Sequence, residues 1–145
     1  YLQDVEDVFD LEYTNGVSYA SIFRQAEFEH SKYTFEVADT DLIHRWFNDF
    51  EKEANRALKE RLVFPAYDYV LKCSHAFNQL DASGAISVSA RADYISRVRL
   101  IAQEIAKLFL EERRKLGFPL MKDRKAAQKF VELLSPNDPL SKDIK

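Results

Sequence analysis

The sequence predicts an all-α fold with about five helices, and three observations lead to this prediction. The chain of 145 residues contains only 3 Gly and 4 Pro, whereas an all-β sandwich or barrel needs a turn signal about every ten residues. Hydrophobic residues make up 46% of the chain and charged residues 31%, a balance typical of one domain with its own core. The apolar residues recur at spacings of three and four over long stretches, as on the buried face of a helix.

Residues 1–16 are expected to form an acidic connection that ends in a turn. Acidic residues alternate there with apolar residues that need a neighbour to bury them: Leu2, Val5, Val8, Phe9 and Leu11. Asn15 and Gly16 favour a turn, because both residue types tolerate positive φ. The helical domain is therefore expected to begin at residue 17 and to extend to residue 120.

Two helices are expected in the first half of this domain. The first runs from Val17 to Glu29. The second begins after Asp39, whose side chain is a good N-cap, and ends near Leu62. The expected buried residues are Tyr19, Ile22, Phe23 and Ala26 in the first helix and Leu42, Ile43, Trp46, Phe47, Phe50, Ala54, Ala57 and Leu58 in the second.

Two longer helices complete the domain. One has Pro65 in its first turn, where the missing N–H is no loss, and ends at Gly84. The other begins after the N-cap Ser87, spans about Val88 to Leu116 and ends at Gly117. The expected buried residues are Ala66, Tyr67, Val70, Leu71, Phe77 and Leu80 in the former and Ile95, Val98, Ile101, Ala102, Ile105, Leu108 and Phe109 in the latter.

Residues 121–134 are predicted to add a shorter amphipathic helix, which begins near Lys122. Its apolar residues are Ala126, Ala127, Phe130, Val131 and Leu134. Residues 135–145 combine Pro136 and Pro139 with mixed charges and little apolar content. Such a composition is typical of a flexible tail.

Global charge and composition exclude several classes of protein. The net charge of −3 gives no overall reason to expect a nucleic-acid or anionic membrane partner. No apolar run approaches the roughly 18 residues of a membrane span, so no membrane partner is expected. Cys73 stands alone and cannot form an intramolecular disulfide, which is compatible with the cytoplasm. The chain starts at Tyr1 and its single Met is Met121, so we expect it to be part of a longer protein.

Catalytic, cofactor-binding and metal-binding residues are not expected in this chain. Cys73 and His75 are two residues apart on a helix and point in nearly opposite directions, so they cannot share a metal ion. The other histidines, His30 and His44, show no ligand spacing. The three glycines stand alone at predicted turns or helix ends, which leaves none for a phosphate-binding loop.

Basic residues on the longest helix are the candidate contact surface. Arg97, Arg113, Arg114 and Lys115 could meet a phosphate-bearing or protein partner. The competing explanation is helix capping and ion pairs within the helix, because acidic residues lie among them.

Several segments resemble the alpha subunit of bacterial glycyl-tRNA synthetase, a class II aminoacyl-tRNA synthetase. The matching stretches, in chain order, are Tyr1 to Gln3, Val8 to Leu11, Phe23 to Glu27, Ser31 to Asp39, Pro65 to Asp81, Ala85 to Val88 and Gly117 to Leu120. One departure concerns a helix cap, since the family commonly has Glu three residues after the serine cap and this chain has Ala90.

The resemblance implies a role in protein synthesis. Such an enzyme, a glycine-tRNA ligase, uses ATP and Mg²⁺ to attach glycine to tRNA(Gly), and it works as a heterotetramer of two alpha and two beta subunits. It also implies that an antiparallel-sheet catalytic domain, which binds ATP and glycine, lies upstream of Tyr1, and that residues 1–3 are the last turn of a helix from that domain. The helices here would be accessory to it.

Two functions follow from these expectations. The first is a helical domain that supports aminoacylation by packing on the catalytic domain through Val5, Val8, Phe9 and Leu11, and by contacting the beta subunit, the second alpha subunit or tRNA(Gly). The alternative is a free-standing helical module that binds RNA or protein and has no catalytic activity.

Overall fold

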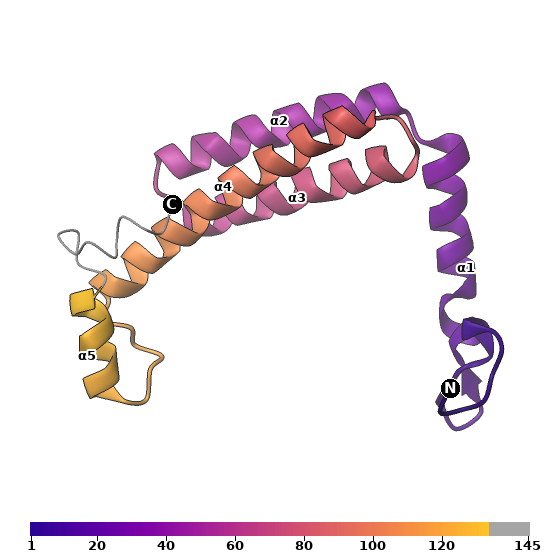
Figure 1. The fold of residues 1–145 in the computed structure, drawn as a ribbon, viewed down its shortest axis with the longest axis horizontal. Helices are drawn as coiled ribbons and strands as arrows, with labels where there is room; N and C mark the ends of the chain where they lie inside the picture. Colours follow the sequence, from indigo (N-terminus) through magenta and orange to yellow (C-terminus); the bar gives the residue numbers. More distant parts are fainter. Residues whose placement is uncertain (134–145) are drawn as a thin grey trace.

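Three helices lie side by side and form an elongated bundle (Figure 1). They are α2 (Thr40–Lys59), α3 (Val63–Ala82) and α4 (Val88–Lys115). The structure is a computed structural model that describes residues 1–133. It confirms the all-α fold: its five α-helices are accompanied by two short helical turns and one two-stranded hairpin.

The core of the bundle consists of two hydrophobic clusters that follow one another along its axis. The first contains Ile43, Phe47, Cys73, Ala76, Leu80 and Tyr94, and the second contains Ala54, Ala57, Ala66, Val70, Ile101 and Ile105. Alanines dominate α2 and α3 in the second cluster, and small side chains allow two helix backbones to approach closely. Each helix therefore contributes one narrow stripe to a shared core.

That stripe is narrower than the sequence predicted. Trp46 is 41% exposed, and Tyr67, Leu71, Ile95 and Phe109 are exposed as well. Ala102 is also exposed on α4. Successive helical residues are about 100° apart, so in a bundle of three helices the flanks of each apolar face remain outside. The expectation that these residues are buried was wrong.

Local signals set the ends of the bundle helices close to where they were expected. The N-caps Asp39 and Ser87 accept hydrogen bonds from the backbone N–H groups of Leu42 and Ala90. Gly84 and Gly117 adopt positive φ after α3 and α4, as the sequence indicated. The end of α2 differs: Arg61 has a φ of 58° and stops the helix at Lys59.

The N-terminal unit, which we define as residues 1–37, projects from one end of the bundle (Figure 1). It comprises the 3-10 turn η1 (Val8–Asp10), the strands β1 (Glu12–Thr14) and β2 (Val17–Ser18), α1 (Tyr19–Lys32) and the π-helical turn η2 (Tyr33–Val37). The strands pair antiparallel around the expected Asn-Gly turn.

Two details of this unit were not foreseen. The helix begins two residues later than expected, because Val17 pairs with Thr14 and Ser18 becomes the N-cap. Residues 1–7 contain no helix, although a final helical turn was expected at residues 1–3. Three residues alone cannot offset the cost of helix nucleation.

At the other end of the bundle, α5 (Arg124–Leu133) follows α4 after a short loop (Figure 1). Asp123 caps it by accepting hydrogen bonds from the N–H groups of Lys125 and Ala126. The helix falls within the expected range 121–134, of which Leu134 lies outside the described residues. The expectation of a flexible tail at 135–145 also falls outside them.

Candidate interaction surface

Arg97 was expected to be a surface contact, but the structure places it against α2. Its Nε donates to Glu51 Oε1 at 3.0 Å, and one Nη donates to the other carboxylate oxygen. The same Nη donates to Asn48 Oδ1 at 2.8 Å. Its guanidinium carbon also lies 4.6 Å from the centre of the Phe47 ring. Arg97 thus joins α4 to α2.

The environment of Arg97 favours this internal role over a phosphate contact. The Arg97 and Glu51 side chains are only 26% and 23% exposed. The hydrogen bonds that Arg97 donates to Glu51 raise the pKa of the guanidinium above its already high value, so the charge is permanent. A bidentate, partly buried pair of this kind is among the stronger polar contacts in proteins.

The other three candidates occupy the last turn of α4 and differ in what they contact. Lys115 pairs with Glu112 at 2.8 Å. Arg113 stacks over Phe109, with its guanidinium carbon 4.8 Å from the ring centre, and its buried Nε has no hydrogen-bond partner within residues 1–133. Arg114 forms no ion pair in the described part of the chain. Arg113 and Arg114 therefore keep unused donors.

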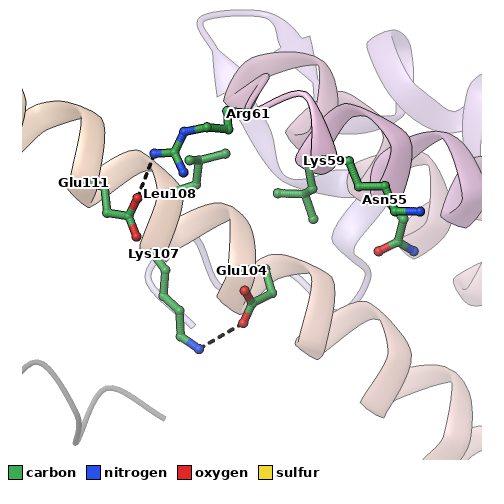
Figure 2. Close-up of a pocket in the computed structure, with 8 residues that line it drawn as sticks. Asn55, Lys59, Arg61, Glu104, Lys107, Leu108 and Glu111 are labelled. Carbon is green, nitrogen blue, oxygen red and sulfur yellow. Dashed lines mark hydrogen bonds and ion pairs between the residues drawn. The ribbon is translucent and has the colours of Figure 1, made fainter. Parts of the chain in front are cut away.

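A pocket of about 370 Å³ opens between α2 and α4 next to this turn. Figure 2 shows Arg61 reaching toward Glu111 and Lys107 reaching toward Glu104. Arg61 pairs with Glu111 at 2.7 Å, and Lys107 pairs with Glu104 at 2.9 Å. The pocket is lined by three cations and two carboxylates, and only Lys59 among the cations has no acidic partner within residues 1–133, so the pocket offers little net charge to a ligand.

Basic residues that the sequence analysis missed lie just beyond α4. They are Lys122, Arg124, Lys125 and Lys129. Between Arg113 and Leu133 there are seven Lys or Arg residues and two acidic residues, a net charge of +5, whereas residues 1–112 hold twelve basic and twenty acidic residues, a net charge of −8. We call residues 113–133 the basic end. A charge count by segment would have found it, because the global value of −3 hides the segregation.

The structure holds the basic end together through contacts between α5 and the end of α4. Arg124 donates to the carbonyl oxygens of Gly117 and Phe118 at 3.3 and 3.4 Å. Phe118 and Phe130 meet edge to face, with ring centres 6.1 Å apart. Ala127 is 1% exposed. These contacts use one face of α5 and leave Lys125 and Lys129 on the exposed side.

Cys73 and His44 occupy structural positions, whereas His30 and His75 are exposed. Cys73 is fully buried in the first core cluster, and this burial raises the pKa of its thiol to about 11. His44 Nδ1 shares a 2.7 Å hydrogen bond with the hydroxyl of Tyr94. Residues 1–133 contain no group of three His, Cys, Asp or Glu side chains that could hold a metal ion.

The apolar residues of the N-terminal unit are largely uncovered. None of the residues of α1 is buried. Phe28 and Phe35 are each 67% exposed, and Ile22 and Val37 are exposed too. Phe9 packs on Tyr19 with ring centres 6.2 Å apart. Of the four residues expected to face a catalytic domain, Phe9 contacts α1 and Val8 is exposed. No helix among the described residues is long and apolar enough to cross a membrane.

The chain is thus a helical domain with an uncovered apolar unit at one end of its bundle and a basic segment at the other. The comparison with known families specifies it further. Residues 1–114 match the family model described as glycyl-tRNA synthetase alpha subunit. The chain belongs to this family, which confirms the resemblance and favours a role in aminoacylation over an unrelated binding module. Residues 115–133, which form most of the basic end, lie outside the matched range.

Proposed function

We propose that this chain is the helical domain of a glycine-tRNA ligase alpha subunit. It supports the ATP-dependent attachment of glycine to tRNA(Gly) through packing and subunit contacts in the cytoplasm, and it does not supply catalytic groups. ATP, Mg²⁺ and glycine bind in this proposal to a catalytic domain outside residues 1–145. The beta subunit and the second alpha subunit complete the assembly.

The observation that carries this proposal is the contrast between the bundle and the N-terminal unit. The α2–α4 bundle has two hydrophobic clusters of its own. Residues 1–37 contribute no buried residue, yet they expose several large apolar side chains. Large exposed apolar patches mark contact sites. The expected catalytic domain is the neighbour of this unit in the chain, and we propose that it covers the exposed side chains.

A truncation tests the proposal. An alpha subunit that contains this domain is compared, together with its beta subunit, with a version that ends before Tyr1. Both glycyl-adenylate formation and association with the beta subunit are measured. We expect both to fall in the truncated version. If adenylate formation and assembly are both unchanged, the domain does not support the enzyme and the proposal is wrong.

A pair of point variants separates packing of the N-terminal unit from general effects of the deletion. Ile22→Ser with Phe28→Ser removes apolar surface from α1, and Val88→Ser with Leu100→Ser removes exposed apolar surface from α4 as a matched control. The α1 variant is expected to lower adenylate formation more than the control does. Equal effects of the two variants would argue against a contact through α1.

A further inference from the structure

We infer that the basic end, residues 113–133, is a phosphate-binding surface that holds the backbone of an RNA, with Arg113, Arg114, Lys125 and Lys129 as its contact residues. The inference rests on the proposed function, because the RNA that it assigns to this surface is the tRNA substrate of that function. It adds a binding site that lies mostly outside the part of the chain that matches the family.

The first argument is electrostatic. A net charge of +5 is concentrated between Arg113 and Leu133, while residues 1–112 carry −8. Residues 1–37 hold two basic and eight acidic residues, a net charge of −6, and residues 38–112 hold ten and twelve, a net charge of −2. A polyanion is therefore repelled by the N-terminal unit and attracted to the opposite end of the molecule. Attraction of this kind acts over about one Debye length, roughly 8–10 Å at physiological salt. The charge segregation therefore both attracts and orients an RNA.

The second argument concerns which cations remain available. Lys59 and Lys107 line the mixed pocket, and Lys107, Arg61, Arg97 and Lys115 are engaged by acidic side chains. Within residues 1–133 the side chains of Arg113, Arg114, Lys125 and Lys129 form no ion pair. Lys125 and Lys129 are one helical turn apart, so their Cβ atoms lie about 6 Å from each other.

The third argument separates RNA from an anionic membrane. A helix that lies on a membrane inserts a free apolar face between the lipids. On α5 that face is partly engaged by the end of α4 and the loop, because Ala127 is buried and Phe130, which keeps 45% exposure, packs against Phe118. What remains exposed on the other side is cationic. Phosphates on a polar backbone fit such a surface better than a bilayer does.

A salt series on the complete 145-residue chain tests the inference. Binding of tRNA(Gly) is measured by fluorescence anisotropy at increasing NaCl. For a surface that contacts phosphates, log K falls linearly with log salt, and each lost contact reduces the slope by about 1. The variant R113Q/R114Q/K125Q/K129Q is expected to bind at least roughly tenfold more weakly and to lose about 2–4 from the slope.

A control variant with the same change in net charge accompanies it. R45Q/K52Q/R56Q/K59Q removes four exposed cations from α2 at a distance from α5 along the chain. Its affinity and slope are expected to stay close to those of the original chain. If both variants lose affinity and slope equally, the effect is one of net charge and the site assignment is wrong. Because phosphate contacts carry no base information, a second tRNA should respond like tRNA(Gly).

A double variant guards against unfolding. K125Q/K129Q removes only side chains that have no ion-pair partner in the described part of the chain. Its circular dichroism spectrum and its midpoint of urea denaturation should therefore match those of the original chain. It is expected to lose about 1–2 from the salt slope. A slope that stays unchanged would overturn the inference, whatever the quadruple variant does.

Two probes decide between RNA and other acidic partners. Vesicles of phosphatidylserine and phosphatidylcholine, and polyglutamate, are offered to the same chain. If the chain binds the vesicles but not tRNA, or if polyglutamate displaces labelled tRNA as well as unlabelled tRNA does, the assignment to RNA is wrong. Weak competition by both probes supports it.

The assembled enzyme distinguishes failure of this inference from failure of the proposed function. Adenylate formation needs no tRNA, so K125Q/K129Q should leave it unchanged while raising the KM for tRNA. If the KM also stays unchanged but the truncation described above abolishes assembly, the inference alone is wrong. If the truncation has no effect on adenylate formation or assembly, the proposed function is wrong.

Discussion

Glu51 and Arg97 have two effects at the scale of single residues. Their hydrogen-bonded pair joins α2 to α4, and their charges act on the thiol of Cys73 in the core cluster nearby. Burial is the larger cause of the raised pKa of Cys73, and the negative charge of Glu51 adds to it. Arg97 acts in the opposite direction and lowers the pKa. The pKa of the Cys73 thiol therefore depends both on the packing of the core and on the charged pair between α2 and α4.

The raised pKa of Cys73 makes stability depend on pH in the alkaline range. The pKa is about 11 in the folded chain against an ordinary 9.0. Between these values the unfolded thiol loses its proton and the folded thiol keeps it, so the free energy of unfolding falls as pH rises. A difference of two pKa units corresponds to a loss of about 2–3 kcal/mol.

Urea denaturation of the original chain and of Cys73→Ala at a series of pH values between 9 and 11 measures this effect. The absolute stability of the variant is lower because a buried side chain is shortened, so only the slopes are compared. A shallower slope in Cys73→Ala is the expected result. Parallel curves would show that the thiol does not titrate differently in the two states.

At the scale of elements, the start of α4 shows how a cap fixes a helix. Ser87 Oγ accepts from the N–H of Ala90 at 3.2 Å, which satisfies one of the free donors of the first turn. A capping box would need an acidic or amide side chain at Ala90 to accept from the N–H of Ser87. This chain makes half of that arrangement.

Ala90→Glu is expected to complete the capping box. A reciprocal hydrogen bond and a negative charge near the positive end of the helix dipole both stabilise the first turn, by about 0.3–1 kcal/mol together. The midpoint of urea denaturation measures it. Ala92→Glu is the matched control, since it adds the same charge at an exposed position beyond the cap. An equal gain in both variants would assign the effect to charge alone.

At the scale of the whole molecule, the two ends of the bundle differ in how they are attached. At one end, α5 is anchored by buried Ala127, an aromatic pair and hydrogen bonds from Arg124. At the other end, α1 has no buried residue and reaches the bundle through the π-helical turn η2. The N-terminal unit is thus held by few packed side chains when the domain stands alone.

Native-state hydrogen exchange should reveal this difference. Amides in the centres of α2, α3 and α4 are expected to exchange only by global unfolding, while those of α1 exchange through a local opening of much lower free energy. Denaturant added below the transition separates the two classes of opening. Equal protection of α1 and α3 would show that the N-terminal unit belongs to the same cooperative unit as the bundle.

Much of the fold could be predicted from local sequence signals. Asp39 and Ser87 at helix starts, and Gly84 and Gly117 at helix ends, act through hydrogen bonds and φ angles within a few residues. Such signals need no knowledge of the rest of the chain. The end of α2 could not be predicted in this way, because an arginine, unlike a glycine, rarely adopts a positive φ and so gives no signal in the sequence. In the structure Arg61 has a positive φ and forms ion pairs with Glu111 and Glu112.

The sequence by itself determined the helical class, most helix ends and the family, since these depend on short-range periodicity and ordered motifs. Only the tertiary structure decided the role of each charge. Arg97 and Glu51 are 46 residues apart in the sequence, and Arg61 and Glu111 are 50 apart. Whether a cation is paired or free depends on which helices pack together, and so does the exposure of Trp46. Packing therefore removed Arg97 from the candidate surface, and the proposed surface now lies at the basic end, where Arg114, Lys125 and Lys129 form no ion pair in the described part of the chain.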